Sequence, residues 1–184
     1  MTRIVAGAVG GRRLAVPPRG TRPTSERVRE ALFSAIEAWT DLDDARVLDL
    51  YAGSGALGFE ALSRGAAAVT FVESDRTAVQ VLKANIATLG LPGASVAQSR
   101  VLTFLTASEA TAHELVLLDP PYADQNTDEV VAALTGWTSP GAIVVLERSA
   151  RSPQPVWHGF LRQVKVRKYG DTALYWAEHH PAED

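Results

Sequence analysis

A carboxylate, two prolines and an aromatic residue stand together at Asp119-Pro120-Pro121-Tyr122, directly after the apolar run 115–118. The end of such a strand is where α/β enzymes place their reactive groups. Proline has no N–H group and a nearly fixed φ, so the two prolines hold Asp119 and neighbouring carbonyls as hydrogen-bond acceptors, while Tyr122 offers a flat face. Acceptors beside a stacking ring suit the exocyclic amino group of a nucleobase. The alternative is a loop that simply ends a strand.

A second motif, about seventy residues earlier, runs from Asp49 to Gly58 and places an apolar strand before a glycine-rich turn and a helix. Gly53 and Gly55 can adopt positive φ and let a ligand touch the backbone, and the helix start presents free N–H groups to an anionic portion. Glu73 ends the next apolar run, where its carboxylate can accept hydrogen bonds from two ribose hydroxyls. The motif therefore predicts a nucleotide-like cofactor.

The glycine pattern alone does not choose between cofactors. Residues 53–58 match the dinucleotide fingerprint G-x-G-x-x-G, and Glu73 lies twenty positions after Gly53. Three features favour another cofactor over NAD: the carboxylate of Asp49 inside the first strand, the Asp-Pro-Pro-Tyr loop, and the lack of an obvious hydride-relay histidine or Tyr/Lys pair. The four histidines are expected to be ordinary surface residues: His113, His158, His179 and His180.

Strand patterns alternate with helical patterns over most of the chain, and this alternation predicts a parallel sheet. A helix is expected from about Ser25, with Thr24 or Ser25 as its N-cap. Residues 161–169 and 173–179 are typical of an antiparallel hairpin. If the strands that carry Asp49 and Asp119 are neighbours, their two motifs share one crevice. The other expected strands are 46–51, 68–74, 94–98, 114–119 and 142–148, and the other expected helices are 56–64, 76–89, 100–110 and 126–136.

The composition indicates one globular domain, since the chain has 184 residues and is 46% hydrophobic. No apolar run approaches the roughly eighteen residues of a membrane span, and the first residues lack the apolar region of a signal peptide, so no membrane association is expected. The absence of cysteine excludes disulfides and Cys-based zinc sites. The histidines show no metal-ligand spacing, so we expect no metal. A cytoplasmic location is expected.

The charges are unevenly divided along the chain, whose net charge is −3. Residues 1–30 have a balance of +5 and the remaining residues a balance of −8. A hairpin expected from 3–7 and 13–16 would form a basic arm, residues 1–20, ahead of a catalytic domain of residues 21–184. Arginine, used in place of lysine throughout this arm, suits bidentate phosphate contacts and stacking on bases. The arginines concerned are Arg3, Arg12, Arg13, Arg19, Arg22, Arg27 and Arg29.

These motifs resemble a known class of enzyme. Asp49 to Gly58, Glu73 and Asp119 to Tyr122 resemble motifs of class I S-adenosylmethionine-dependent methyltransferases, and the last resembles the (Asp/Asn)-Pro-Pro-aromatic signature of those that methylate exocyclic amines. The resemblance then narrows to the RsmD family, guanine-N2 methyltransferases of small-subunit (16S) ribosomal RNA. It covers nearly the whole chain and is carried by residues 3–7, 11–14, 22–33 and 49–55.

The resemblance implies a Rossmann-like α/β fold with a mostly parallel seven-stranded sheet and an antiparallel C-terminal hairpin. It implies S-adenosyl-L-methionine as the methyl donor and a guanine of 16S rRNA, in the small ribosomal subunit or its assembly intermediate, as the acceptor; we expect a monomer. The catalytic residues would be Asp119, Pro120, Pro121 and Tyr122. The cofactor would be bound by Asp49, Tyr51, Ala52, Gly53, Ser54, Gly55, Leu57, Gly58, Glu73, Ser74, Arg100 and Val101. The RNA would be contacted by Arg3, Arg12, Arg13, Arg19, Arg22, Thr24, Arg27 and Arg29.

One position departs from the family pattern, and two rival functions stay open. After the third strand the family usually has Gly-Asp to approach the adenine, and here Ser99-Arg100 stand there. The adenine must then be contacted by backbone groups or by other residues. A DNA or protein-glutamine methyltransferase would share the chemistry of the Asp-Pro-Pro-Tyr loop, although DNA enzymes usually carry a larger target-recognition region. A non-catalytic nucleic-acid-binding module, or a nicotinamide dehydrogenase, would keep the fold without needing Asp119.

Overall fold

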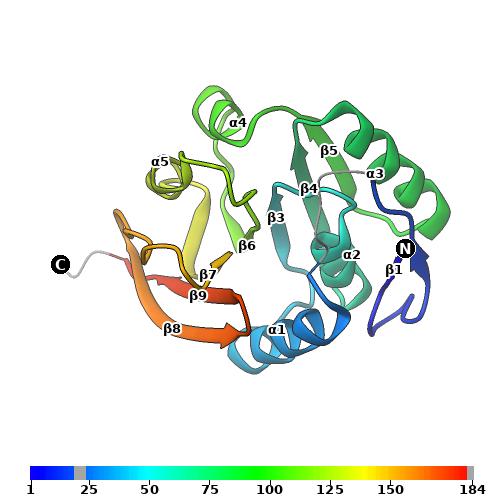
Figure 1. Cartoon of the computed structure of the whole chain (residues 1–184), viewed down its shortest axis with the longest axis horizontal. Coiled ribbons are helices and arrows are strands. Elements are labelled where there is room, and N and C mark those ends of the chain that lie inside the picture. The colour runs from blue at the N-terminus through cyan, green and yellow to red at the C-terminus, as the bar shows by residue number, and fades with distance from the viewer. Residues whose placement is uncertain (19–23, 182–184) are drawn as a thin grey trace.

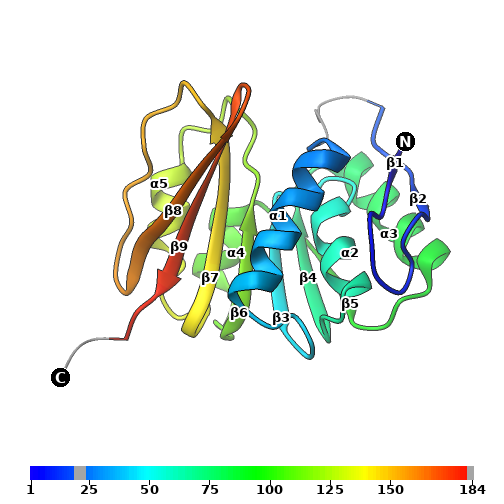
Figure 2. The same ribbon diagram turned by 90° about the horizontal axis from the view of Figure 1, so that it is seen from below.

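The computed structural model describes residues 1–18 and 24–181, and its centre is a seven-stranded sheet (Figure 1). The strands are β3 (Arg46–Leu50), β4 (Ala68–Glu73), β5 (Ala94–Gln98), β6 (His113–Leu118), β7 (Thr138–Ser149), β8 (Leu161–Tyr169) and β9 (Thr172–His179). They lie in the order β5-β4-β3-β6-β7-β9-β8. Neighbours from β5 to β7 are parallel, and β9 is antiparallel to both β7 and β8 (Figure 2). The predicted α/β fold with an antiparallel C-terminal hairpin is confirmed.

Helices cover both faces of the sheet, as the strands require because residues on both of their faces are apolar. On one face, Val47 packs in a core with side chains of α1 (Glu26–Trp39), α2 (Ala56–Ser63) and α3 (Arg76–Leu89). On the other face, Leu48 packs in a second core with side chains of α4 (Val101–Ala107) and α5 (Thr127–Ala132). Figure 1 shows α1 and α4 on opposite sides of the sheet. Asp49 follows in the same alternation and therefore points to the α2 face.

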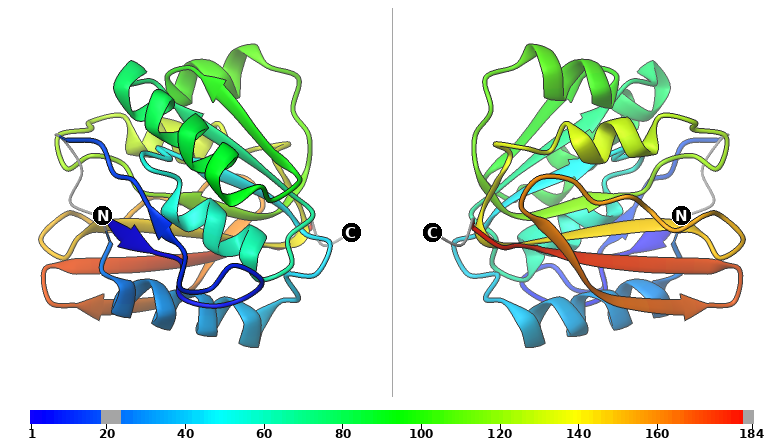
Figure 3. Two further views of the ribbon diagram at one scale, coloured as in Figure 1. Left: turned by 90° about the vertical axis from the view of Figure 1, so that its right-hand side faces the viewer. Right: turned by 90° about the vertical axis from the view of Figure 1, so that its left-hand side faces the viewer.

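The N-terminal segment packs on α2 rather than standing apart from the sheet domain (Figure 3). Its two strands, β1 (Thr2–Arg3) and β2 (Arg13–Leu14), are antiparallel but shorter than the predicted 3–7 and 13–16. The pairing stops early because the N–H groups of Val5 and Ala6 donate to the Glu60 carboxylate at 2.8 and 3.0 Å. Ile4 and Leu14 are completely buried in the core that contains α1 to α3.

Most predicted element bounds agree with the structure to within a few residues. α1 begins after Ser25, whose side chain accepts a hydrogen bond from the N–H of Val28, so Ser25 and not Thr24 is the N-cap. β7 begins at Thr138 rather than at residue 142, and α5 ends at Ala132 rather than at residue 136. Among residues 1–18 and 24–181, no helix combines the length and the apolar character needed to cross a membrane.

Candidate active site

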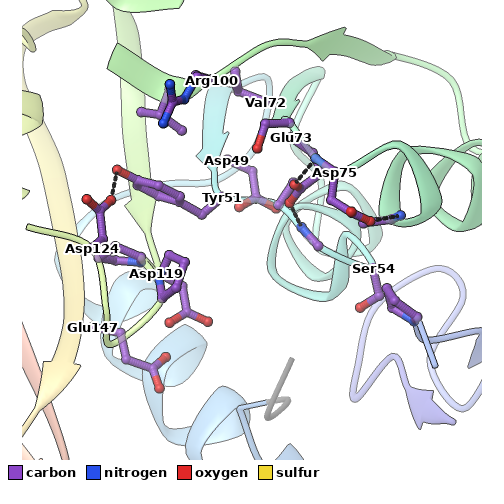
Figure 4. Close-up of a pocket in the computed structure, with 18 of the residues that line it drawn as sticks. Asp49, Tyr51, Ser54, Val72, Glu73, Asp75, Arg100, Asp119, Asp124 and Glu147 are labelled. Carbon is purple, nitrogen blue, oxygen red and sulfur yellow. Dashed lines mark hydrogen bonds between the residues drawn. The ribbon is translucent and has the colours of Figure 1, made fainter. Parts of the chain in front are cut away.

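A cavity of about 1150 Å³ opens at the carboxyl ends of the central parallel strands (Figure 4). β3 lies between β4 and β6, so the direction in which the chain adds strands reverses between β3 and β6. Ligands of open α/β sheets bind at such a reversal. Leu50 of β3 is paired with Leu118 of β6, and the two predicted motifs leave the sheet directly after these residues. The prediction that they share one crevice is confirmed, since residues of both line the cavity.

The glycine-rich turn forms one wall. Tyr51 and Gly53 have φ values of 62° and 55°, and the N–H of Gly55 closes the turn on the carbonyl of Ala52 at 2.8 Å. Ten of the twelve predicted cofactor residues line the cavity; Gly55 and Gly58 do not. A Cβ on Gly55 would lie 2.5 Å from Leu82, and one on Gly58 would lie 2.3 Å from Phe71. These two glycines therefore shape the turn and its packing from behind, and their contact with the cofactor stays a prediction.

Glu73 ends β4 at the bottom of the same wall. Its Oε2 accepts a hydrogen bond from the N–H of Gly53 at 2.8 Å, and its Oε1 accepts one from the N–H of Asp75 at 2.8 Å. A carboxylate can accept about four hydrogen bonds, so Glu73 keeps capacity for two hydroxyls. Asp75 is itself the N-cap of α3. The backbone thus fixes the orientation of the Glu73 carboxylate, which lines the cavity.

Asp49 of β3 also lines the cavity and is almost completely buried. It is 1% exposed and accepts a hydrogen bond from the N–H of Gly58 at 2.9 Å. Burial raises the pKa of Asp49 to about 7, the hydrogen bond from Gly58 opposes this shift, and the charge of Glu73 adds to it. Near neutral pH this carboxyl group therefore exists in both protonation states.

The Asp-Pro-Pro-Tyr loop forms the opposite wall. All four of its residues line the cavity, and the Tyr122 side chain is 64% exposed at the mouth. Burial raises the pKa of Asp119 well above its ordinary value, and the nearby charges of Glu147 and Asp49 raise it further. The hydroxyl of Tyr51 donates to Oδ2 of Asp124 at 2.6 Å, which connects the glycine turn to this loop.

The structure adds residues that the sequence prediction missed. Glu147, near the carboxyl end of β7, lines the cavity beside Asp119, and Thr24 donates its hydroxyl to Oε2 of Glu147 at 2.8 Å. Thr24, predicted to contact RNA, lines the cavity, and its contact with RNA stays a prediction. Pro17 and Pro18 also line it. A carboxylate at the end of an apolar strand was the signal that found Glu73 and Asp119, and the same signal was present at Glu147.

The region predicted for the adenine contains Arg100, Val101 and Leu102, all of which line the cavity. The side chain of Ser99 turns away, because its hydroxyl donates to the carbonyl oxygen of Arg100 at 3.0 Å. Arg100 precedes the first turn of α4 and approaches the cavity from above Tyr51 (Figure 4). In place of the missing carboxylate, Val101 and Leu102 offer an apolar surface and Arg100 offers a planar guanidinium group.

The predicted RNA-contacting arginines divide into three groups. Arg29 is completely buried and its Nε lies 3.4 Å from Oε2 of Glu60, so the prediction that it contacts RNA is wrong. Arg3 is exposed and paired with Glu26 at 2.8 Å, and exposed Arg12 donates to the carbonyl of Thr88 at 2.7 Å. The exposed side chains of Arg13 and Arg27 complete the set in the part of the chain that the structure describes. Arg19 and Arg22 lie outside the described residues.

Two histidines differ from expectation. His113 is buried, and its ring packs against Trp137 while its Nδ1 lies 3.2 Å from the Trp137 carbonyl oxygen. His179 is 9% exposed and bonds to the hydroxyl of Thr138 at 2.8 Å. Both side chains are packed parts of the fold and neither lines the cavity, so the expectation of surface residues is wrong for them.

Comparisons with known proteins identify the family. A model of the family described as conserved hypothetical protein 95, which is the RsmD family, matches residues 2–178. The chain belongs to the RsmD family. This RsmD-family chain is 42% identical over 156 residues to ribosomal RNA small subunit methyltransferase D of Escherichia coli strain K12, covering 83% of this chain and 77% of the relative. It is 38% identical over 157 residues to the protein of that name in Haemophilus influenzae, covering 82% and 80%.

Solved structures agree with this assignment to the RsmD family. The structure of yhhF from Escherichia coli superposes with a TM-score of 0.88 at 37% identity, covering 97% of each chain. A hypothetical protein of Thermus thermophilus superposes with a TM-score of 0.84 at 33% identity, covering 97% of this chain and 99% of the other. As an RsmD-family member the chain is a methyltransferase, its methyl donor is S-adenosylmethionine, and the dehydrogenase alternative is excluded.

Proposed function

We propose that this enzyme transfers a methyl group from S-adenosylmethionine to the exocyclic N2 amine of a guanine in small-subunit ribosomal RNA. The names of its relatives support an RNA of the small subunit as the substrate. The observation that carries the choice of an amine is the position of Asp119, which lines the donor cavity next to the exposed ring of Tyr122. The loop offers acceptors and a stacking surface, which an amine on a base requires.

The residues present fit S-adenosylmethionine. Gly53, with its positive φ, removes side-chain bulk from the turn beside the cavity, and Glu73 is held by the backbone as an acceptor for ribose hydroxyls. Val101 and Leu102 supply an apolar surface for a purine. When bound, S-adenosylmethionine supplies a methyl group on a positively charged sulfur, so that a C–N bond forms while the C–S bond breaks with its electron pair on sulfur and one N2 proton leaves.

Asp119 and Tyr122 would do the work on the acceptor side. The Asp119 carboxylate and the carbonyl of Pro120 accept hydrogen bonds from the amine, which draws the nitrogen lone pair out of conjugation with the ring. Tyr122 stacks on a base that is splayed out of the RNA. Most of the acceleration then comes from orientation, which can lower a barrier by about 7–11 kcal/mol.

The RNA outside the cavity would be held by the basic N-terminal arm, residues 1–20, ahead of the methyltransferase domain of residues 21–184. Exposed Arg13 in the arm supports this role, and exposed Arg27 at the start of α1 extends the basic surface, because guanidinium groups bind phosphate and make affinity dependent on salt. We propose that the enzyme acts as a monomer in the cytoplasm, on the small subunit or its assembly intermediate.

The test is transfer of radiolabelled methyl from S-adenosylmethionine to small ribosomal subunits that lack this modification, followed by nucleoside analysis. We expect N2-methylguanosine as the labelled product. Naked 16S rRNA and assembly intermediates, assayed in parallel, distinguish the true form of the substrate. Absence of label on RNA, together with calorimetric binding of the donor, would overturn the proposal and favour DNA or protein-glutamine acceptors.

A further inference from the structure

Glu147 and Asp119 occupy matching positions on neighbouring strands. Leu118 of β6 is paired with Leu146 of β7, and each of these leucines is followed directly by one of the two carboxylates. Both carboxylates line the cavity, and Figure 4 shows them at the same side of it. Burial raises the pKa of both groups, and the charge of Glu147 adds to the shift at Asp119, so the two lie close enough to interact.

Glu147 is held in place from outside the sheet. Its Oε2 accepts the hydroxyl of Thr24 at 2.8 Å, across 123 positions of sequence. This contact engages one lone pair of the carboxylate, which has about four acceptor positions. Thr24 itself lines the cavity, so the hydrogen bond orients the carboxylate at the cavity wall. No second hydrogen bond to this carboxylate comes from residues 1–18 or 24–181, which leaves acceptor positions for a ligand.

The edge of guanine that carries the N2 amine is chemically distinctive. Two donors, N1–H and the N2 amine, stand side by side on it, whereas adenine and cytosine present an unprotonated ring nitrogen at the position of N1–H. An ionised carboxylate can only accept hydrogen bonds, and hydrogen bonds from the two donors of guanine favour the ionised form of both groups against the burial that raises their pKa. Two adjacent carboxylates therefore match the donor pair of guanine and repel the lone pair of the other bases. Asp119 alone could accept from an amine but could not identify the base that carries it.

We propose that Glu147, oriented by Thr24, accepts the hydrogen bond of guanine N1–H and makes the enzyme specific for guanine. This inference rests on the proposed function, because it assigns the base that enters beside Asp119. Glu147 is then a specificity-determining residue that contacts the substrate, whereas Thr24 is a positioning residue that acts through Glu147. Neither role requires a step of bond making or breaking.

The test uses 2-aminopurine, which keeps the N2 amine but has an acceptor at N1 in place of the donor. Small subunits are reconstituted with 16S rRNA carrying either guanine or 2-aminopurine at the methylated position, once that position is mapped. We expect the wild-type enzyme to methylate guanine at least about tenfold faster, because a site built around a buried hydrogen bond rejects a base that cannot form it. In Glu147→Gln, whose amide can also donate to N1, we expect this preference to fall at least about tenfold.

The ratio of the two rates is informative even if a variant folds poorly, because both substrates meet the same active fraction. Calorimetric binding of S-adenosylmethionine to Glu147→Gln serves as the control for the donor site, and Thr24→Val is expected to weaken the preference in the same direction. An unchanged ratio in Glu147→Gln, with N2-methylguanosine still formed, would overturn the inference alone. Failure of the wild-type enzyme to label guanine-containing subunits would instead overturn the proposed function.

Discussion

The hydroxyl of Tyr51 lies 2.6 Å from Oδ2 of Asp124 and donates a hydrogen bond to it. Burial, together with this contact, raises the pKa of Tyr51, so the hydroxyl remains a donor throughout the physiological range. Tyr51 belongs to the glycine-rich turn and Asp124 to the loop that begins at Asp119. The bond therefore joins the wall proposed to hold the methyl donor to the wall proposed to present the acceptor base.

Loss of the hydrogen bond between Tyr51 and Asp124 is expected to weaken the binding of S-adenosylmethionine. Tyr51→Phe deletes the hydroxyl and keeps the ring, and the loss of one hydrogen bond worth about 1 kcal/mol corresponds to about a fivefold higher Kd for S-adenosylmethionine. Asp124→Asn is the matched control, because its amide oxygen can still accept from Tyr51. Isothermal calorimetry measures both, and equal losses in the two variants would contradict the assignment of the effect to this bond.

Asp119 is expected to affect the transfer rate far more than donor binding. A hydrogen bond to a charged acceptor is worth roughly 1.5–3 kcal/mol, so Asp119→Ala should lower the single-turnover methylation rate at least about tenfold while the Kd for S-adenosylmethionine stays nearly constant. Asp119→Asn keeps an acceptor oxygen and should retain more of the activity. Parallel loss of methylation and of donor binding in Asp119→Ala would instead indicate that Asp119 maintains the structure of the site.

The raised pKa of Asp49, about 7, gives a pH dependence of stability with a defined sign. The folded protein keeps this proton to higher pH than the unfolded chain, whose Asp pKa is about 4. The stabilisation is therefore present at low pH and is lost as the pH rises from about 4 to about 7. We expect Asp49→Asn, which can still accept from the N–H of Gly58, to raise the free energy of unfolding at pH 8 by about 1–3 kcal/mol.

Urea unfolding without S-adenosylmethionine at pH 5 and pH 8 measures this effect. At pH 5, about one unit above the unfolded pKa, only about a third of the stabilisation has been lost, so the variant should exceed the wild type by much less than at pH 8. A difference of the same size at both pH values would show that packing, and not the ionisation of Asp49, separates the two proteins.

Arg27 and Arg29 lie two positions apart on α1, and we expect one to affect RNA binding and the other to affect stability. Arg29→Met leaves Glu60 without one of its buried cations and is expected to lower the free energy of unfolding by about 3 kcal/mol, with little change in the salt dependence of RNA binding.

Arg27→Ala removes an exposed cation and should leave stability within about 0.5 kcal/mol. Its RNA affinity should fall, and the slope of log K against log salt should decrease by about 0.7–0.9. Denaturation and salt-titrated binding measure the two properties, and a salt slope unchanged in Arg27→Ala would argue against phosphate contact there.

The motif positions could be predicted from the sequence because each lies where an apolar strand ends. The runs before Asp49, Glu73 and Asp119 fix the strands, and a parallel sheet brings their carboxyl ends together. The sequence does not place Thr24 beside Glu147, because the two residues are 123 positions apart and meet only in the tertiary structure. The number of arginines near the N-terminus suggested RNA contact, but it does not indicate which of these side chains are buried.

The burial of Arg29 could have been predicted from its position on the apolar face of α1, although its charge suggested RNA contact. Arg29, Leu32, Phe33 and Ile36 are the buried residues of α1, and they recur at the spacing of one helical face. An arginine on an apolar face requires a buried partner, and that partner, Glu60, comes from a different helix. The partner could be identified only from the tertiary structure.

The lining of the cavity has a consequence for how a polynucleotide can approach it. Among the lining residues that the structure describes, six are carboxylic acids and Arg100 is the single cation: Asp49, Glu73, Asp75, Asp119, Asp124 and Glu147. Burial raises the pKa of Asp49, Asp119 and Glu147, and the members of this lining that are ionised repel phosphate and attract cations or groups rich in hydrogen-bond donors. The ribose-phosphate chain is thereby kept at the rim, and an uncharged base can enter alone. We therefore expect the acidic cavity and the exposed arginines outside it to orient a nucleotide before any base-specific contact forms.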